Sequence, residues 1–341
     1  MNLIIDKENW ESLIQSRRSN IEFYDTCERL MKKQLDVKFN FLKSDVTDNL
    51  SKTILSRFLA GFGESKKIEF GEIKVPLRPI SFKNCQEWGW NEYSSVFMIS
   101  DENISNFKKK KMVLMCEEGE ELKTLRCLFC GEDDSFDERI NPSRMFLSSW
   151  KQIFEAIKPK ESDTLFPLPC SDIVISDRYL FKNQKELVEV NLCELLSCLT
   201  ECDTKDDRSK VNIVIFTIDE YLKKFDVDTA KKIINKAIEK STGKKANITF
   251  VTSHDSDKIN HDRFIFTNYH KIESGDSFIY FDTSGKFISK GMGLHIYSLA
   301  KKENYDDMKA TQKELNEIVE TINKANSDCI IGDRKSNFIK F

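Results

Sequence analysis

The chain lacks any apolar run long enough to cross a bilayer. Its first residues, MNLIIDKENWESL, also lack the basic region and apolar stretch of a secretion signal. Proline is scarce, with six in 341 residues, and 40% of the residues are hydrophobic, which argues against long disordered segments. We therefore expect a folded cytoplasmic protein without membrane contact, of a length typical of two domains.

A strong positive charge is also absent. The formal net charge is -3, whereas electrostatic binding of nucleic acid depends on clustered Lys and Arg. Cations gather only locally, in the run Lys108–Lys111 and along one side of residues 231–245. A solvated helix face also explains the second group, and we adopt that interpretation.

The cysteines show no pairing pattern, and the four histidines all lie at position 254 or later. Scattered thiols in a cytosolic protein behave as small apolar residues. Cys127 and Cys130, followed by Gly131, form half of a zinc knuckle, but the sequence offers no second half. We expect no metal or other cofactor, and a metal-dependent nuclease using the acidic loop Glu132–Glu138 is left as a third possibility.

From residue 172 onward, apolar residues alternate between strand and helix periods. The order β-α-β-α-β-β-β predicts an α/β domain with a mixed sheet flanked by helices. The expected strands are Asp172–Phe181, Val211–Ile218, Asn247–Thr252, Arg263–Thr267 and Ser277–Asp282. The expected helices are Val188–Leu199 and Asp228–Ser241, the second stopped by Gly243, with Gly291–Ala300 leading to a final helix.

The N-terminal part has a different pattern. Helical spacing predicts helices within 7–35 and at 50–62 and 144–157, and strands and turns are expected over 68–100 and 112–116. Lys158–Asp163, which contains Pro159, is the expected boundary between two domains. We therefore expect an α+β N-terminal domain at 1–160 and the α/β domain at 161–341. The N-terminal aromatic residues are interpreted as core.

Residues suited to phosphate chemistry gather around the fourth expected strand. His261-Asp262-Arg263 begins that strand, Asn268 lies five residues after Arg263, and Gly275 follows seven residues later. His261 and Arg263 share one face because strand side chains alternate. A purely structural cluster, in which Asp262 and Arg263 pair with each other, explains the same residues equally well.

This spacing resembles the signature of the phospholipase D superfamily: His-x-Lys, then Asp five residues after the Lys, then Gly-Ser seven residues after the Asp. In this chain Arg263 stands for Lys, Asn268 for Asp and Asp276 for Ser. The resemblance covers about residues 171–300 and implies a phospholipase D-like half-domain. Asn268 is the most damaging departure, because a neutral amide cannot stabilise an imidazolium as a carboxylate does.

The resemblance implies a role for each matching residue. His261 would attack phosphorus, Arg263 would clamp the phosphate, Asn268 would orient the imidazole, and Gly275 would allow a close backbone approach. Arg178, in the Ser-Asp-Arg sequence of the first strand, is a second phosphate candidate. An Asp-Arg pair that closes a strand end is the interpretation we prefer for Arg178.

Two functions follow from the resemblance and its departures. The first is an intracellular phosphodiesterase or nuclease that binds, and if active cleaves, nucleic-acid phosphodiesters without a metal. Such proteins build one site from two His strands, so a single copy implies a homodimer. The alternative is a catalytically inactive protein-protein interaction module of a multi-subunit complex. With no metabolic signature in the sequence, we assign either function to a prokaryotic defence (antiviral) or mobile-element system.

Overall fold

The computed structural model divides into two compact units. The first contains Met1–Ser135, Pro159–Leu165 and Ala300–Lys302, and the second contains Phe136–Lys158, Phe166–Leu299 and Glu303–Phe341. The sequence boundary was expected at 160, whereas residues 136–158 have their contacts in the second unit. The structure describes residues 2–5, 7–33, 36–47, 49–60, 68–71, 95–98, 114–115, 138–142, 145–157, 170, 172–201, 210–253, 263–267, 270–289, 293–299, 302–325, 327–336 and 338–341.

The first unit contains a sheet of order β3-β2-β1-β4-β5 in which every pairing is parallel. A parallel sheet with helices is an α/β arrangement and differs from the α+β domain expected from the sequence. The strand at residues 2–5 was missed, while the helices expected at 7–35 and 50–62 are present. The strands are β1 (Asn2–Ile5), β2 (Asp36–Phe39), β3 (Ile68–Phe70), β4 (Ser95–Met98) and β5 (Leu114–Met115), and the helices are α1 (Lys7–Ser19), α2 (Ile21–Lys33) and α3 (Asn49–Ala60).

Aromatic side chains form the core of this unit. The ring of Trp10 meets Phe39 edge-on at 5.4 Å and Phe58 at 4.9 Å, and Phe39 stacks on Phe70 at 4.6 Å. Trp10, Phe39 and Phe58 are buried. This agrees with the interpretation of the N-terminal aromatic residues as core.

The second unit is built on a mixed sheet of order β13-β9-β8-β7-β10-β11-β12-β6. Strands β7, β8 and β9 are mutually parallel, and the other pairings are antiparallel. The strands are β6 (Glu138–Ile140), β7 (Asp172–Ser176), β8 (Asn212–Ile218), β9 (Asn247–Ser253), β10 (Arg263–Thr267), β11 (His270–Ser274), β12 (Leu294–Ser298) and β13 (Ile330–Gly332). The expected mixed sheet flanked by helices is therefore confirmed.

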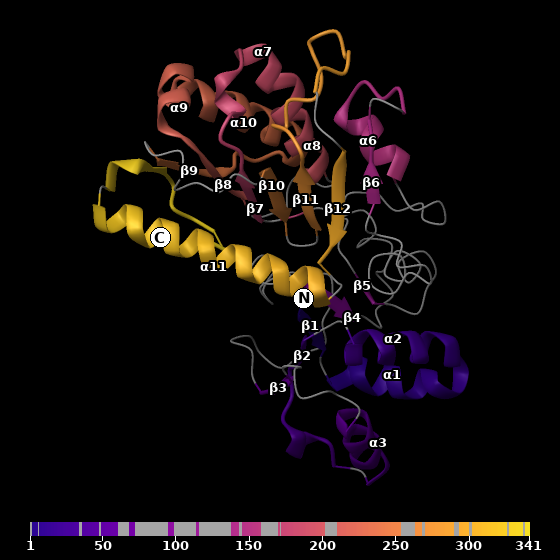
Figure 1. Cartoon of the computed structure of the whole chain (residues 1–341). Helices are drawn as coiled ribbons and strands as arrows, with labels where there is room; N and C mark the ends of the chain where they lie inside the picture. The colour runs from indigo at the N-terminus through magenta and orange to yellow at the C-terminus, as the bar shows by residue number, and fades with distance from the viewer. Residues whose placement is uncertain are drawn as a thin grey trace. The chain divides into compact units, whose positions relative to one another are not determined.

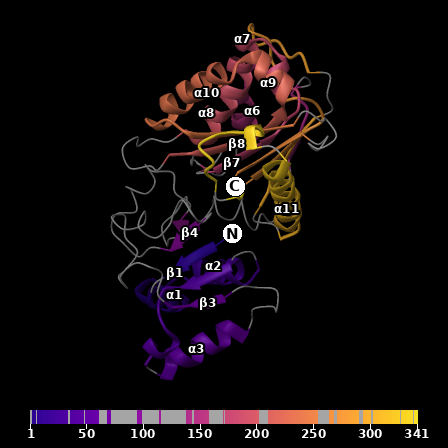
Figure 2. The same cartoon turned by 90° about the vertical axis from the view of Figure 1, so that its left-hand side faces the viewer.

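Helices cover both faces of this sheet. The α-helices are α6 (Trp150–Ile157), α7 (Lys185–Val188), α8 (Glu194–Thr200), α9 (Asp219–Phe225), α10 (Val227–Thr242) and α11 (Lys302–Ala325), and a π-helical turn, η4 (Glu189–Cys193), joins α7 to α8. Figure 1 and Figure 2 show α11 on one side of the sheet and α8 and α10 on the other. None of the helices in the described residues is long and apolar enough to span a membrane.

The layers follow from the strand pattern. Val174 and Phe216 point toward α11, where they join Met308, Leu315 and Val319 in one buried cluster. Their neighbours along the strands point to the opposite face because strand side chains alternate. Strands β7 and β8 are therefore buried on both faces, which explains their nearly continuous apolar sequence.

Two expected strands need correction. Ser277–Asp282 forms no strand apart from a single bridge at Phe281, and the fifth strand is instead His270–Ser274. The backbone amides of residues 278, 280 and 281 are bonded to side chains rather than to a neighbouring strand. The first strand also ends at Ser176, and Leu180–Lys182 forms a 3-10 turn, η3. The segment before the final helix contains a further strand, Leu294–Ser298.

Candidate functional site

The carboxyl ends of β7 and β8 meet the start of β10 at one edge of the sheet. Strand β10 runs antiparallel to β7, with Phe264 opposite Ser176. Arg263, the first residue of β10, and Asp177, the residue that follows β7, therefore lie at the same edge. Ligands of α/β sheets bind beyond the carboxyl ends of the strands, so this edge is the first place to look for a site.

Arg263 is the main cation at this edge. Its Nη1 donates to the carbonyl oxygen of Gly275 at 3.4 Å, and its Cζ lies 5.5 Å from the centroid of the Tyr179 ring. The buried Nε has no hydrogen-bond partner, and in the described part of the chain no carboxylate forms an ion pair with this guanidinium. A guanidinium with donors that no carboxylate takes up is suited to binding an anion.

Asp177 holds the loop beneath Arg263. Its buried carboxylate accepts hydrogen bonds from the Ser277 hydroxyl at 2.7 Å and from the backbone N–H groups of Phe278 and Tyr179, each at 2.9 Å. Burial raises the pKa of Asp177, while these hydrogen bonds and the charge of Arg263 oppose that rise. The carboxylate thus joins the end of β7 to the segment that begins at Gly275.

Asn191 fixes the next part of the same segment. Its Oδ1 accepts from the backbone N–H groups of Tyr280 and Phe281, and its Nδ2 donates to the carbonyl oxygens of Phe281 and Leu187. Asn191 lies in η4 and is fully buried. π-Helical turns often occur near functional sites, and this one provides a polar clamp.

Two tyrosines and a lysine extend the site. The rings of Tyr179 and Tyr221 lie 6.0 Å apart, and the Nζ of Lys182 is 5.6 Å from the first centroid and 5.8 Å from the second. We refer to Tyr179, Lys182, Tyr221 and Arg263 as the edge cluster. Sequence reasoning missed three of its members. Their signal was their position, within six residues of the carboxyl ends of two neighbouring parallel strands.

The predicted phosphate ligands are placed as follows. The Arg263 guanidinium donates to the carbonyl oxygen of Gly275, a contact that the motif spacing did not predict. Arg178 lies at the same edge but is only 3% exposed, and its carbonyl oxygen accepts from the Thr217 hydroxyl. Asp276, at the Ser position of the signature, accepts from the backbone N–H of Ser277. The predicted residues His261, Asn268, Cys127 and Cys130 lie outside the described residues.

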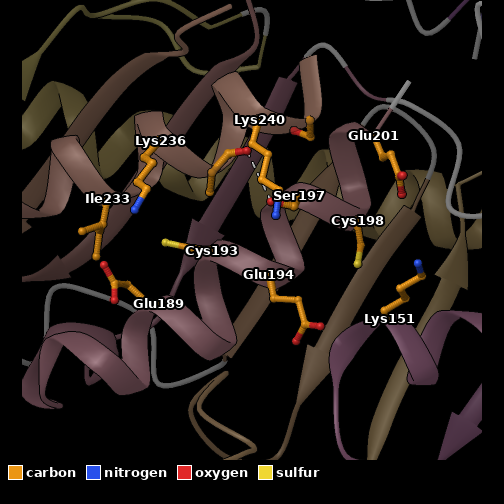
Figure 3. Close-up of a pocket in the computed structure, with 12 residues that line it drawn as sticks. Lys151, Glu189, Cys193, Glu194, Ser197, Cys198, Glu201, Ile233, Lys236 and Lys240 are labelled. Atoms are coloured by element: carbon orange, nitrogen blue, oxygen red, sulfur yellow. Dashed lines mark hydrogen bonds between the residues drawn. The ribbon is translucent and has the colours of Figure 1, made fainter. Parts of the chain in front are cut away.

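A separate hollow lies between the helices of the second unit. It has a volume of about 480 Å³, and Figure 3 shows Lys and Glu side chains interspersed around the thiols of Cys193 and Cys198. Burial raises the pKa of each thiol to about 12, and neighbouring carboxylates contribute. A raised pKa keeps a thiol in its protonated form at neutral pH, which disfavours either cysteine as a nucleophile. The lining is Lys151, Glu189, Cys193, Glu194, Ser197, Cys198, Glu201, Ile233, Lys236, Ala237, Lys240 and Ser241.

The polar groups of this hollow serve helix packing. The Glu194 carboxylate accepts from the backbone N–H of Trp150 at 3.2 Å, at the start of α6, and burial raises its pKa. The Ser197 hydroxyl donates to the carbonyl oxygen of Ala237 at 3.4 Å, which joins α8 to α10. Among the described residues, no group of three or more His, Cys, Asp and Glu side chains could hold a metal ion. The edge cluster is therefore the stronger candidate site.

Comparisons with protein-family models and with curated proteins give no match for this chain.

Proposed function

We propose that the second unit is a phospholipase D-like module that binds phosphodiesters of nucleic acid at the carboxyl edge of β7 and β8. The observation that carries this proposal is the position of Arg263. Its guanidinium lies over the Tyr179 ring and is bonded to the neutral carbonyl of Gly275, with no ion pair to a carboxylate in the described residues. A planar guanidinium held in this way is suited to a phosphate, which it can bind through two donors.

Three further features support the proposal. The parallel strands β7, β8 and β9 continue into the antiparallel strands β10 and β11, and Arg263 begins β10 beside the carboxyl ends of β7 and β8, where ligands of α/β sheets usually bind. Gly275 contacts Arg263 at the spacing of the resemblance. Lys182 adds a second cation to the same edge.

Catalysis is assigned to His261 within this proposal. Its imidazole would attack phosphorus, forming a phospho-histidine and releasing one ester oxygen as an alcohol, and water would then hydrolyse the intermediate. A second copy of the chain would supply the other histidine, which protonates the leaving oxygen. Asn268 in place of Asp leaves the imidazolium poorly stabilised, so we expect slow turnover.

Binding is tested by fluorescence anisotropy with a labelled oligonucleotide across a salt series. Arg263→Gln should weaken binding about tenfold and lower the slope of log affinity against log salt by about one, because one phosphate contact is lost. Lys313→Gln is the matched control, since Lys313 is an exposed cation on α11, 80% accessible and paired with Glu317. Equal affinities for Arg263→Gln and the wild type would contradict the proposal.

Cleavage is tested separately with bis(p-nitrophenyl) phosphate. Hydrolysis by the wild type that survives a chelator and disappears in His261→Ala supports a metal-independent phosphodiesterase. Binding without hydrolysis in either protein would leave a nucleic-acid-binding module. If the protein neither binds oligonucleotides nor hydrolyses the phosphodiester, but forms a stable complex with another protein, the interaction module is favoured.

A further inference from the structure

We infer that the edge cluster takes unpaired nucleobases, so that single-stranded nucleic acid is the ligand class of this site. Tyr179 and Tyr221 would provide stacking surfaces, and Lys182 and Arg263 would hold the adjacent phosphates. This inference rests on the proposed function, because the same Arg263 binds phosphate in both. It goes further by assigning selectivity to the two tyrosines.

The two tyrosines differ from the core aromatic residues of their unit. Both are partly exposed, and their rings are tilted by 48° at 6.0 Å rather than stacked. Tyr280, in contrast, is buried, stacks on Trp150 at 5.0 Å, and its hydroxyl bonds to Ser274 at 2.7 Å. In the described part of the chain the hydroxyls of Tyr179 and Tyr221 have no hydrogen-bond partner. Packing of the core therefore does not account for these two rings.

Among the described residues no carboxylate forms an ion pair with a cation of the edge cluster, and the buried Asp177 carboxylate acts on Arg263 only through its charge. Lys182 is exposed, lies near the two tyrosine rings, and forms no ion pair with any residue that the structure describes. Nearby lysines behave differently: Lys223 pairs with Asp219 at 2.7 Å, and Lys185 pairs with Glu189 at 3.8 Å. The pairing with Lys223 also neutralises Asp219, the carboxylate that begins α9 on the carboxyl side of β8. Lys182 therefore places a positive charge beside two aromatic rings at this edge.

This combination distinguishes single strands from other phosphate ligands. Unpaired bases stack on aromatic side chains with a gain of about fivefold to a hundredfold in affinity per base. A duplex keeps its bases inside its own stack, and a phosphate chain without bases meets only the cations. We therefore expect single strands to bind most tightly, and tyrosine substitutions to act only on ligands that carry bases.

The experiment compares three labelled ligands of equal length by fluorescence anisotropy: oligothymidylate, its duplex with oligoadenylate, and an abasic deoxyribose-phosphate chain. The wild-type full chain should bind oligothymidylate at least about tenfold more tightly than either of the others. Tyr221→Ala should weaken oligothymidylate binding about tenfold and leave binding of the abasic chain unchanged. Tyr221→Phe should retain the wild-type affinity because it keeps the ring.

Matched variants complete the test. Phe146→Ala removes an aromatic ring that is 93% exposed but outside the edge cluster, and it should change nothing. Lys182→Gln should weaken both the base-carrying and the abasic single strands, whereas Lys185→Gln should weaken neither. Circular dichroism and thermal unfolding of each variant show whether a loss of affinity is caused by a loss of folded protein. The variants Tyr179→Phe and Tyr179→Leu repeat the comparison at the second ring.

The outcomes separate this inference from the proposed function. If the three ligands bind equally, and Tyr221→Ala changes nothing while Arg263→Gln weakens them all, the stacking inference is overturned and phosphate binding stands. If no oligonucleotide or abasic chain binds, both fail. Binding to phosphatidylserine vesicles in place of any oligonucleotide would identify a lipid surface and would also overturn the inference.

Discussion

The carboxylate of Asp177 accepts a hydrogen bond from the hydroxyl of Ser277 at 2.7 Å, across 100 residues of sequence. This contact joins the end of the central strand β7 to the segment after β11. The same carboxylate also accepts from the backbone N–H of Phe278. Because Gly275 begins that segment and its carbonyl meets Arg263, the position of the guanidinium depends on Asp177.

Asp177→Asn should lower the free energy of unfolding by about 2 kcal/mol, because an amide replaces one carboxylate oxygen and leaves a buried donor without its acceptor. The variant should also bind oligonucleotides less tightly than the wild type, since the loop under Arg263 loosens. Urea unfolding and anisotropy measure the two effects. Asp226→Asn is the control, because Asp226 caps α10 through the Thr229 N–H and Asn caps helices equally well. Wild-type stability in Asp177→Asn would contradict this role.

Asn191→Leu should be more damaging, with a loss of about 3 kcal/mol. The change keeps the branching of the side chain but leaves the backbone N–H groups of Tyr280 and Phe281 without their acceptor in a buried site. Urea unfolding measures the loss. Asn183→Ala is the comparison, because Asn183 is only half-buried and its amide donates to carbonyl oxygens near the site edge. If both variants lose the same free energy of unfolding, the hydrogen bonds of Asn191 contribute no more to stability than those of Asn183.

Lys271 provides a test of a nearly buried charge. Its Nζ lies 2.6 Å from a carboxylate oxygen of Asp307 on α11 and 2.8 Å from Glu273. Burial alone lowers the pKa of Lys271, but hydrogen bonds and attraction from the two carboxylates outweigh it and raise the pKa. The double variant Glu273→Gln, Asp307→Asn should lose about 2 kcal/mol, since the ammonium stays buried without a counter-charge.

Adding Lys271→Met to that double variant should restore most of the lost stability, because the buried charge is removed. Urea unfolding of the wild type, the double variant and the triple variant measures both steps. Glu320→Gln, which breaks an exposed pair with Lys324, is the control and should have no measurable effect. A triple variant no more stable than the double variant would show that Lys271 contributes through packing alone.

His270 should make stability depend on pH. Burial lowers its pKa from 6.5 to about 3, so between these values the unfolded chain binds a proton that the folded chain does not. The free energy of unfolding is therefore unaffected by His270 above pH 6.5, and it falls by about 1.4 kcal/mol for each pH unit below that value. Between pH 7.5 and 5.5, the wild type should lose about 1.4 kcal/mol more than His270→Phe.

The measurement is urea unfolding of both proteins at each pH. Between pH 7.5 and 8.5 the imidazole is neutral in the folded and unfolded chains, so the two proteins should change in parallel, which is the control. An equal loss in wild type and His270→Phe between pH 7.5 and 5.5 would show that His270 stays solvated or finds a partner for its proton.

Several elements could be predicted from local pattern. The helix expected at Asp228–Ser241 is observed at Val227–Thr242, and Gly243 ends it with a left-handed φ of 78°. Arg263–Thr267 is observed with the expected bounds. In both cases local periodicity and end residues agree with the tertiary packing, so a short window of sequence contains enough information.

Strand β11 could not be predicted in this way. Its sequence, HKIES, has a histidine and a lysine at positions that are buried in the fold. The fold tolerates both side chains: the lowered pKa of His270 keeps its imidazole neutral, and the ammonium of Lys271 is paired with Asp307, 36 residues later. The apolar run Ser277–Asp282 was wrongly expected to be a strand. Its backbone N–H groups donate to the side chains of Asp177 and Asn191 and not to a neighbouring strand.

The sequence by itself predicted the mixed α/β unit, because strand and helix periods are local properties. It also nominated Arg263 and Gly275 as candidate site residues through strand alternation and motif spacing. Only the tertiary structure brings Tyr179, Lys182 and Tyr221 together with Arg263. The first two lie at the 3-10 turn η3, Tyr221 lies in α9 and Arg263 begins β10, and these elements meet only because β8 and β10 flank β7. It also decided which cations stay unpaired at this edge, because ion pairs depend on distances that no sequence window contains.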